Sequence, residues 1–175
     1  SVDTSMGFTP VEGVVMGTRC GDVDAGIVTF LQSKYDLDVK GVNDVLNKKS
    51  GFLGVSGVSS DARDIEAAAK DGNHRAQLAM EMFRYRVKKF IGAYAAAMNG
   101  VDMIVFTGGI GENDISVRED VCTGCSFLGI DFDSEANNVR GEDRIITKPG
   151  SKVTVTTVTT NEELVIAQDT MRLTT

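Results

Sequence analysis

Hydrophobic residues recur along this chain mostly at steps of three and four, the spacing that predicts helices. The clearest run predicts a helix over 73–98, and arginine and lysine residues occupy its opposite side. We expect its apolar stripe to lie in the core or at a dimer seam rather than around a ligand. The stripe consists of Leu78, Met82, Phe83, Val87, Phe90, Ile91, Tyr94 and Met98. Shorter helices are predicted at 24–35, 42–48, 61–70, 116–122 and 162–172.

Short β-branched runs predict strands at 103–107, 144–147 and 153–159, the first of them central to the sheet. The sequence Lys148-Pro149-Gly150-Ser151 fits a type II turn between the last two, because proline and glycine occupy its central positions. The first twenty residues are expected to form strand and loop, and the glycine-rich stretch 51–57 a loop. Helices that alternate with a few strands indicate an α/β domain with a mixed sheet.

Composition narrows the range of functions. A length of 175 residues suits one domain with a real core. A formal net charge of −7 argues against a nucleic-acid binder, which would need a basic face. No apolar run approaches the roughly 20 residues that cross a bilayer, and the N-terminus lacks the features of a secretory signal. We therefore expect no nucleic-acid or membrane partner and a cytoplasmic location.

The three cysteines suggest no disulfide framework, because their number is odd. Cys122 and Cys125 form a C-x-x-C pair, but zinc would need two further ligands. The only histidine, His74, lies far away in the sequence, at the start of the predicted long helix. We interpret the cysteines as reduced thiols and His74 as a surface residue.

A glycine-rich turn is the most distinctive local feature. The strand predicted at 103–107 ends at Gly108, Gly109 and Gly111, and helix-start residues follow at Asn113 and Asp114. Glycines at such a place let backbone N–H groups approach an anionic or nucleotide ligand. The turn is neither the dinucleotide fingerprint, since Asp114 replaces the third glycine, nor a Walker A loop, since no Gly-Lys-Ser/Thr follows. Spacing alone favours a turn that serves only chain geometry.

Four segments together resemble the acetate kinase family, which comprises acetate and propionate kinases within the acetate/sugar kinase, Hsp70 and actin superfamily. They are DTSMGFTPVEGVVMGTRCGD (3–22), NKKSGFLGVSGVSSDARDI (47–65), FTGGIGEN (106–113) and TNEELVIAQDT (160–170). The resemblance implies a ribonuclease H-like fold, with 1–175 as the C-terminal nucleotide-binding domain. It also implies that the first strand or two and an N-terminal domain are missing, which would leave an unpaired sheet edge.

The resemblance assigns roles to individual residues. It implies that Arg19 stabilises the transferring phosphoryl group; the alternative is a surface arginine paired with Asp22 or Asp24. It places Asp61, Ala62 and Arg63 at the nucleoside end of the nucleotide site, although a helix cap would also explain Asp61. Ala62 is smaller than the residue that the family leads us to expect.

The glycine turn and the last helix complete the implied site. Gly109, Ile110, Gly111, Glu112 and Asn113 match a nucleotide-contacting loop, although no role for Glu112 follows from its residue type. Glu162 matches the carboxylate that helps to hold Mg²⁺, and one glutamate is a reasonable share for that ion. Thr159 replaces an expected proline, which could loosen the approach to Glu162. His74 matches no functional position.

The implied activity is reversible, ATP-dependent phosphorylation of acetate to acetyl phosphate with Mg²⁺, in a homodimer. Because the N-terminal domain would supply further transition-state contacts, each worth roughly 3–4 kcal/mol, the isolated chain is expected to show little catalysis. The alternatives are a propionate kinase and a noncatalytic nucleotide-binding or dimerisation fragment. A sugar kinase fits the NEEL and SSDARD segments poorly.

Overall fold

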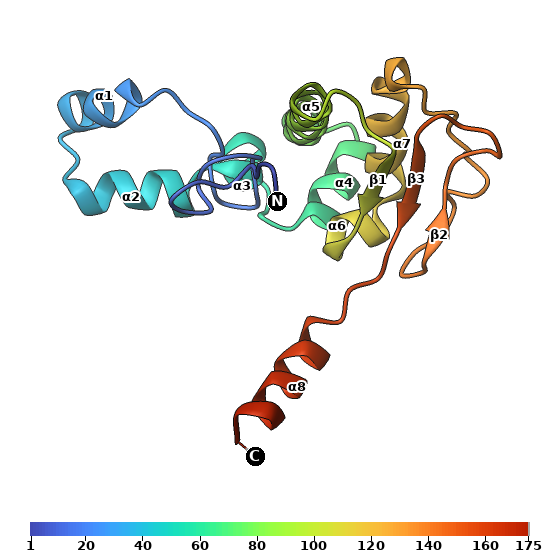
Figure 1. The fold of residues 1–175 in the computed structure, drawn as a ribbon. Helices are drawn as coiled ribbons and strands as arrows, with labels where there is room; N and C mark the ends of the chain where they lie inside the picture. The colour runs from blue at the N-terminus through green and yellow to red at the C-terminus, as the bar shows by residue number, and fades with distance from the viewer. Residues whose placement is uncertain (175) are drawn as a thin grey trace. The chain divides into compact units, whose positions relative to one another are not determined.

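The computed structural model describes residues 1–174, and the chain divides into two compact units, Ser1–Asn99 and Gly100–Thr175 (Figure 1).

The first unit is helical. Residues 1–25 contain no helix or strand, so the strand expected among the first twenty is not formed. Five helices follow: α1 (Gly26–Tyr35), α2 (Val39–Lys48), α3 (Gly51–Ser56), α4 (Ala62–Lys70) and α5 (His74–Ala97). Their starts follow from local chemistry, because Asp38, Asp61 and Asn73 accept hydrogen bonds from the first free N–H groups of α2, α4 and α5.

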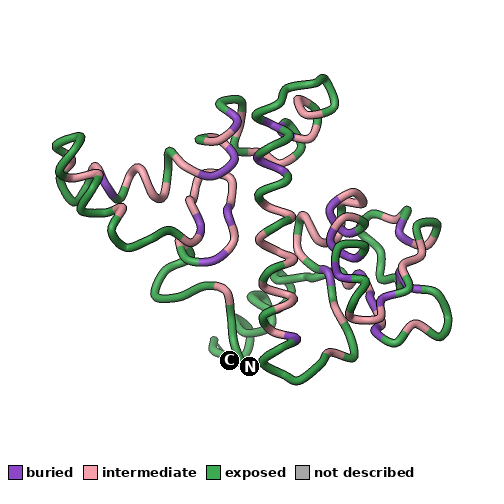
Figure 2. Tube along the Cα trace, turned by 90° about the horizontal axis from the view of Figure 1, so that it is seen from above, coloured by how far each residue is buried: buried purple, intermediate pink, exposed green. Residues whose placement is uncertain are grey.

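The core of this unit lies where α3 and α4 pack against α5. Phe52, Ile65, Ala76, Ala79 and Met80 are buried there, and Figure 2 shows how burial alternates with exposure along α5. The predicted stripe of α5 is a different set of residues. Its eight members are half-buried or exposed. Phe83 packs edge-on against the core residue Phe52, with ring centroids 5.7 Å apart, but the stripe as a whole does not form the core of this unit.

The second unit contains the sheet. Its elements are β1 (Met103–Phe106), α6 (Gly108–Asn113), α7 (Ile115–Gly124), the 3₁₀ turn η1 (Ser126–Leu128), β2 (Arg144–Ile145), β3 (Thr154–Thr157) and α8 (Glu162–Thr174). The strand order is β1-β3-β2, with β1 parallel and β2 antiparallel to β3. The mixed α/β prediction is therefore confirmed, but the central strand is β3 and not β1.

Local chemistry again sets the ends of these elements. The turn before β3 closes through a hydrogen bond from Ser151 N to Lys148 O of 3.2 Å, and Gly150 has φ +89°, as a type II turn requires. Asn161 Oδ1 accepts from Leu164 N at the start of α8. Every described residue of α8 is exposed. Within residues 1–174, no helix is both long and apolar enough to cross a membrane.

The loop predicted around 51–57 is instead the helix α3. Glycines lower helix propensity, but the first N–H groups of α3 bind backbone carbonyls of an earlier segment, and this tertiary contact overrides propensity.

Candidate active site

The segment Met16–Arg19 is fixed on the start of α3. Phe52 N donates to Met16 O at 2.9 Å, Leu53 N donates to Gly17 O at 3.0 Å, and Ser50 N donates to Thr18 O at 3.0 Å. These donors are the N–H groups that a helix start leaves without intrahelical partners. The loop that carries Arg19 is therefore held by its backbone, and the Thr18 hydroxyl adds a hydrogen bond of 2.7 Å to Asn47 O.

Two glycines permit this close contact. Gly51 has φ +64°, and a Cβ there would lie 2.1 Å from Met16 O. A Cβ on Gly17 would lie 2.6 Å from Ser60 O, the residue before Asp61. The structure thus brings the Arg19 loop and the start of α4 together within the first unit.

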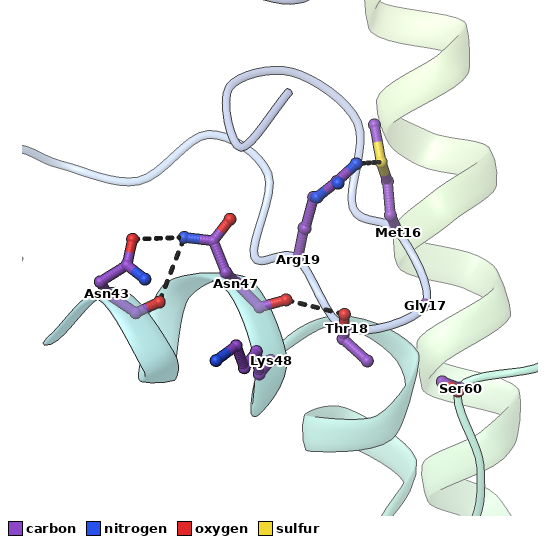
Figure 3. Close-up of a pocket in the computed structure, with 8 residues that line it drawn as sticks. All are labelled: Met16, Gly17, Thr18, Arg19, Asn43, Asn47, Lys48 and Ser60. Carbon is purple, nitrogen blue, oxygen red and sulfur yellow. Dashed lines mark hydrogen bonds between the residues drawn. The ribbon is translucent and has the colours of Figure 1, made fainter. Parts of the chain in front are cut away.

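A pocket of about 550 Å³ opens beside this loop (Figure 3). It is lined by Met16, Gly17, Thr18, Arg19, Asn43, Asn47, Lys48 and Ser60. Two of these side chains are cationic and none is a carboxylate, although Lys48 Nζ also lies 2.8 Å from Asp44 Oδ1. The remaining polar groups are amides and hydroxyls. Such a lining favours an anionic ligand.

Arg19 is half-buried, and its Nη1 lies 3.6 Å from Met16 Sδ. The alternative pairing of Arg19 with Asp22 or Asp24 is not found. Asp22 instead binds Arg86 Nη1 at 3.2 Å and Gly13 N at 2.7 Å. Asp24 accepts from Gly26 N. The guanidinium of Arg19 is therefore in no ion pair among the described residues.

Asp61 and Arg63 are bound to each other. Arg63 Nε and Nη2 donate to the two carboxylate oxygens of Asp61 at 3.0 and 2.6 Å, and Arg63 N donates to Oδ1 at 2.9 Å. These hydrogen bonds lower the pKa of Asp61 to about 2. Asp61 is thus the N-cap of α4, which is the helix-cap explanation that its position in the sequence also allows. The Arg63 side chain stays 90% exposed. Ala62 lies between them as the first residue of α4.

The predicted nucleotide loop Gly109–Asn113 is helical, because it belongs to α6. The three glycines of α6, which begins at Gly108, are explained differently. Gly108 has φ +70°, and a Cβ on Gly111 would lie 3.1 Å from Phe106 C. A Cβ on Gly109 would meet nothing within 4 Å, and its φ is not positive. Chain geometry therefore explains Gly108 and Gly111 but leaves Gly109 unexplained. Ile110 and Asn113 lie on the same short helix, where Asn113 Nδ2 donates to Gly109 O.

Glu112 connects α6 to the segment before α8. Its Oε1 accepts from Gly108 N, Thr160 N and Thr160 Oγ1, each at 3.0 Å. Asp143 Oδ1 accepts from Thr159 N at 2.7 Å and from Thr159 Oγ1 at 2.8 Å. The replacement of proline at Thr159 therefore does not loosen this approach, since proline could not donate the first of these bonds.

Glu162 begins α8 and is exposed, with Glu163 beside it. Within residues 1–174, no group of three or more His, Cys, Asp or Glu side chains could hold a metal ion. The donor set therefore fits Mg²⁺ only as one carboxylate among waters and substrate phosphates, which is the coordination that this ion prefers.

The two cysteines of the C-x-x-C pair are buried, and His74 is exposed. Burial raises the pKa of the Cys122 thiol to about 12, and Cys122 and Cys125 are each 1% exposed. A thiol with so high a pKa is a poor nucleophile and metal ligand. His74 is exposed at the start of α5, as expected.

The predicted residues divide between the two units, with Arg19 and Asp61–Arg63 in the first, and Gly109–Asn113 and Glu162 in the second. Sequence reasoning missed Lys48, Asn43 and Asn47, which only the packing of α2 beside the loop brings to the pocket. It also missed Arg118, whose fully buried guanidinium donates to Gly111 O at 2.9 Å and to Asn137 and Val139. No sequence signal distinguishes this arginine from a surface one.

Comparison with known proteins gives a consistent result. Residues 1–168 match the model of the acetokinase family. An acetate kinase from Halothermothrix orenii is 58% identical over 173 residues, which is 99% of this chain and 44% of that protein. The crystal structure of Porphyromonas gingivalis acetate kinase matches with a TM-score of 0.91 at 59% identity, over 98% of this chain and 43% of that one.

A propionate kinase structure from Francisella tularensis also matches, with a TM-score of 0.87 at 39% identity, over 95% of this chain and 42% of that one. The predicted fold, that of the actin, Hsp70 and sugar kinase superfamily, is confirmed by these likenesses. The chain spans less than half the length of the relatives that it matches.

Proposed function

Since the chain belongs to the acetokinase family, we propose that it carries one part of the active site of an acetate kinase. The reaction is reversible transfer of the γ-phosphoryl group of ATP to acetate, which forms acetyl phosphate and ADP. The observation that carries the proposal is the pocket beside the Arg19 loop, because it presents two cations and no carboxylate to an anionic ligand.

Arg19 is the group that we assign to the phosphoryl group in flight. The transferring group spreads its negative charge over three equatorial oxygens, and a guanidinium donates two parallel hydrogen bonds to such oxygens. Arg19 suits this role because its loop is anchored by the start of α3 and its charge is not neutralised by a neighbouring acid.

We assign nucleotide binding to Asp61, Ala62 and Arg63 and, on α6, to Gly109, Ile110, Gly111 and Asn113. Both carboxylate oxygens of Asp61 fix the orientation of the Arg63 guanidinium, and the Arg63 side chain is exposed. An exposed guanidinium of fixed orientation suits stacking on an adenine ring. The open space beside Gly109 supports close approach of the backbone to a ligand.

Glu162 would hold Mg²⁺, directly or through water. When bound, the ion neutralises charge on the phosphate oxygens of the nucleotide. Because one exposed carboxylate is the whole contribution of this region, the remaining ligands would be waters, phosphates and residues of a further domain. For the same reason we expect the 175-residue chain alone to form no measurable acetyl phosphate.

Two other functions stay open. A propionate kinase would differ in its acyl pocket, and the likeness to the propionate kinase structure favours this alternative. A noncatalytic nucleotide-binding or dimerisation role is favoured by the half-buried and exposed stripe on α5.

Calorimetric titration of the chain with MgADP and, separately, with acetyl phosphate tests the proposal. We expect Gly109→Ala to weaken MgADP binding by about tenfold or more, equivalent to at least about 1.4 kcal/mol, and to leave acetyl phosphate binding unchanged. Arg19→Gln should weaken acetyl phosphate binding alone. Gly92→Ala is the matched control, since a Cβ there also meets nothing within 4 Å. MgADP binding by Gly109→Ala at wild-type affinity would remove the nucleotide assignment.

A further inference from the structure

Glu112 occupies the junction between the two functional segments of the second unit. We propose that Glu112 is a positioning residue. Through Thr160 it holds the segment before α8, and with it Glu162, against the start of α6 at Gly109. The proposal rests on the function proposed for Glu162 and Gly109. It assigns Glu112 a mechanical role instead of a contact with nucleotide or metal.

The need for such a tie follows from the backbone. Residues 158–161 lie between β3 and α8 and have no regular secondary structure. Val158 N donates to Phe106 O at 2.9 Å and so continues the pairing with β1. After that residue, the backbone N–H groups of Thr159 and Thr160 have no strand partner and donate to carboxylates instead. Side chains therefore set the path of the chain into α8.

Glu112 reaches this segment from a distant part of the sequence. Thr160 donates both its N–H and its hydroxyl to Glu112 Oε1, across 48 positions of sequence. These two bonds are the largest causes of the lowered pKa of Glu112. The same oxygen also accepts from Gly108 N at the start of α6. One carboxylate oxygen thus joins the residue before Gly109 to the residue two positions before Glu162.

α6 is itself rigidly held, so that Glu112 is a firm anchor. Arg118 donates to Gly111 O, Gly141 N donates to Glu112 O at 3.2 Å, and Arg140 donates to Asn113 O. The carbonyl groups at the end of this short helix are therefore bound by groups outside it. Motion of the Thr160 segment relative to the turn would have to break the bonds to Glu112.

The contacts at Oε1 argue against a direct role for that oxygen in ligand binding. It already accepts three hydrogen bonds from the protein. An oxygen in that state has no free lone-pair direction for a metal ion or for a ribose hydroxyl. Oε1 therefore serves the site through Thr160.

Amide hydrogen exchange in the ligand-free chain tests the tie without any activity. In Glu112→Ala the amide of Thr160 loses its acceptor, and we expect its exchange to become about tenfold faster or more. Glu112→Gln keeps an acceptor oxygen and should retain most of the protection. Glu119→Ala is the matched control, because Glu119 is an exposed carboxylate on α7 of the same unit. Unchanged exchange at Thr160 in Glu112→Ala would overturn the proposal.

The second readout separates positioning of Glu162 from general support of α6. We expect Glu112→Ala to abolish most of the gain in ADP affinity that Mg²⁺ gives, while the affinity for ADP in EDTA stays within about twofold of wild type. Thr160→Val should act in the same direction but less strongly, since it removes only the hydroxyl bond. Equal weakening of ADP binding with and without Mg²⁺ would mean that Glu112 supports only α6.

The two proposals fail in different ways. If the wild-type chain binds no ADP in either condition, the assignment of nucleotide binding is wrong. The exchange rate of Thr160 in Glu112→Ala still decides whether Glu112 holds the start of α8.

Discussion

Asp61 and Arg63 illustrate how side chains of the candidate site are ordered by one another. The carboxylate of Asp61 caps α4 and binds the guanidinium of Arg63 with both oxygens. Such a bidentate pair restricts the arginine rotamers in the absence of any ligand. Stacking of a nucleotide on Arg63 would therefore cost less side-chain conformational entropy than stacking on a free arginine.

The Asp61–Arg63 pair makes the stability of the fold depend on pH. Because the folded-state pKa of Asp61 is about 2, below its unfolded value, its contribution to stability is fully present above about pH 4 and is lost as the pH falls towards 2. Carboxyl NMR titration should give a midpoint near that value in the wild type and a higher one in Arg63→Gln. Arg172→Gln, which removes an exposed arginine of α8, should leave it unchanged. A midpoint near 4 in the wild type would show that the pair does not form in solution.

The surroundings of the candidate residues were predictable from the sequence only in part. Arg19 lies, as expected, in a glycine-flanked polar loop. Whether Asp22 neutralises it could not be predicted, because Arg86, the actual partner of Asp22, is 64 positions away. Glu112 could not be assigned for a similar reason, since its partner Thr160 is 48 positions away.

At the scale of elements, helices with strong caps and periodic apolar residues were predicted well. Asn73 accepts from Arg75 N and Ala76 N and starts α5 where the sequence indicates. The failure at α3 has a definite cause. Three glycines in seven residues predict a loop by propensity, but the N–H groups of α3 bind the carbonyls of the Arg19 loop. That contact depends on two segments about 35 residues apart, which no local pattern reports.

Gly51 should therefore be essential for the way α3 holds the Arg19 loop. In Gly51→Ala the new Cβ meets Met16 O at 2.1 Å and the residue must keep a positive φ. The left-handed backbone alone costs about 1–2 kcal/mol, and we expect a larger total loss of unfolding free energy by urea denaturation. Gly92→Ala in α5 should instead stabilise the chain by up to about 1 kcal/mol. Equal midpoints for the two variants would contradict this account of the loop.

At the scale of the whole molecule, the structure leaves much apolar surface uncovered. Leu78 and Met82 of the α5 stripe are 42% and 38% exposed, and neither lies in the core of the first unit. The stripe was expected to be either core or dimer seam, and the packing of Ala76, Ala79 and Met80 towards the interior leaves the second possibility.

We therefore expect the chain to self-associate through this stripe. Sedimentation velocity should show a species of twice the 18.7 kDa chain mass that dissociates in the double variant Leu78→Lys with Met82→Lys. Two lysines facing two lysines across a symmetric interface bury four unpaired charges, which is strongly unfavourable. Phe127→Lys, a change at another exposed apolar residue, is the control. A monomer at all concentrations, or a dimer that survives both lysines, would exclude the stripe as the seam.

The parallel pairing of β1 with β3 has a consequence for the order of folding. Met103 pairs with Thr154, so about fifty residues must be synthesised and looped back before β1 gains its partner. The contacts of α3, α4 and α5 in the first unit join neighbours in sequence. During synthesis the helical unit can therefore assemble as soon as its last residue has left the ribosome. The apolar segment of β1 stays unpaired until β3 has been synthesised. In this interval the nascent chain is most exposed to aggregation and most dependent on chaperones.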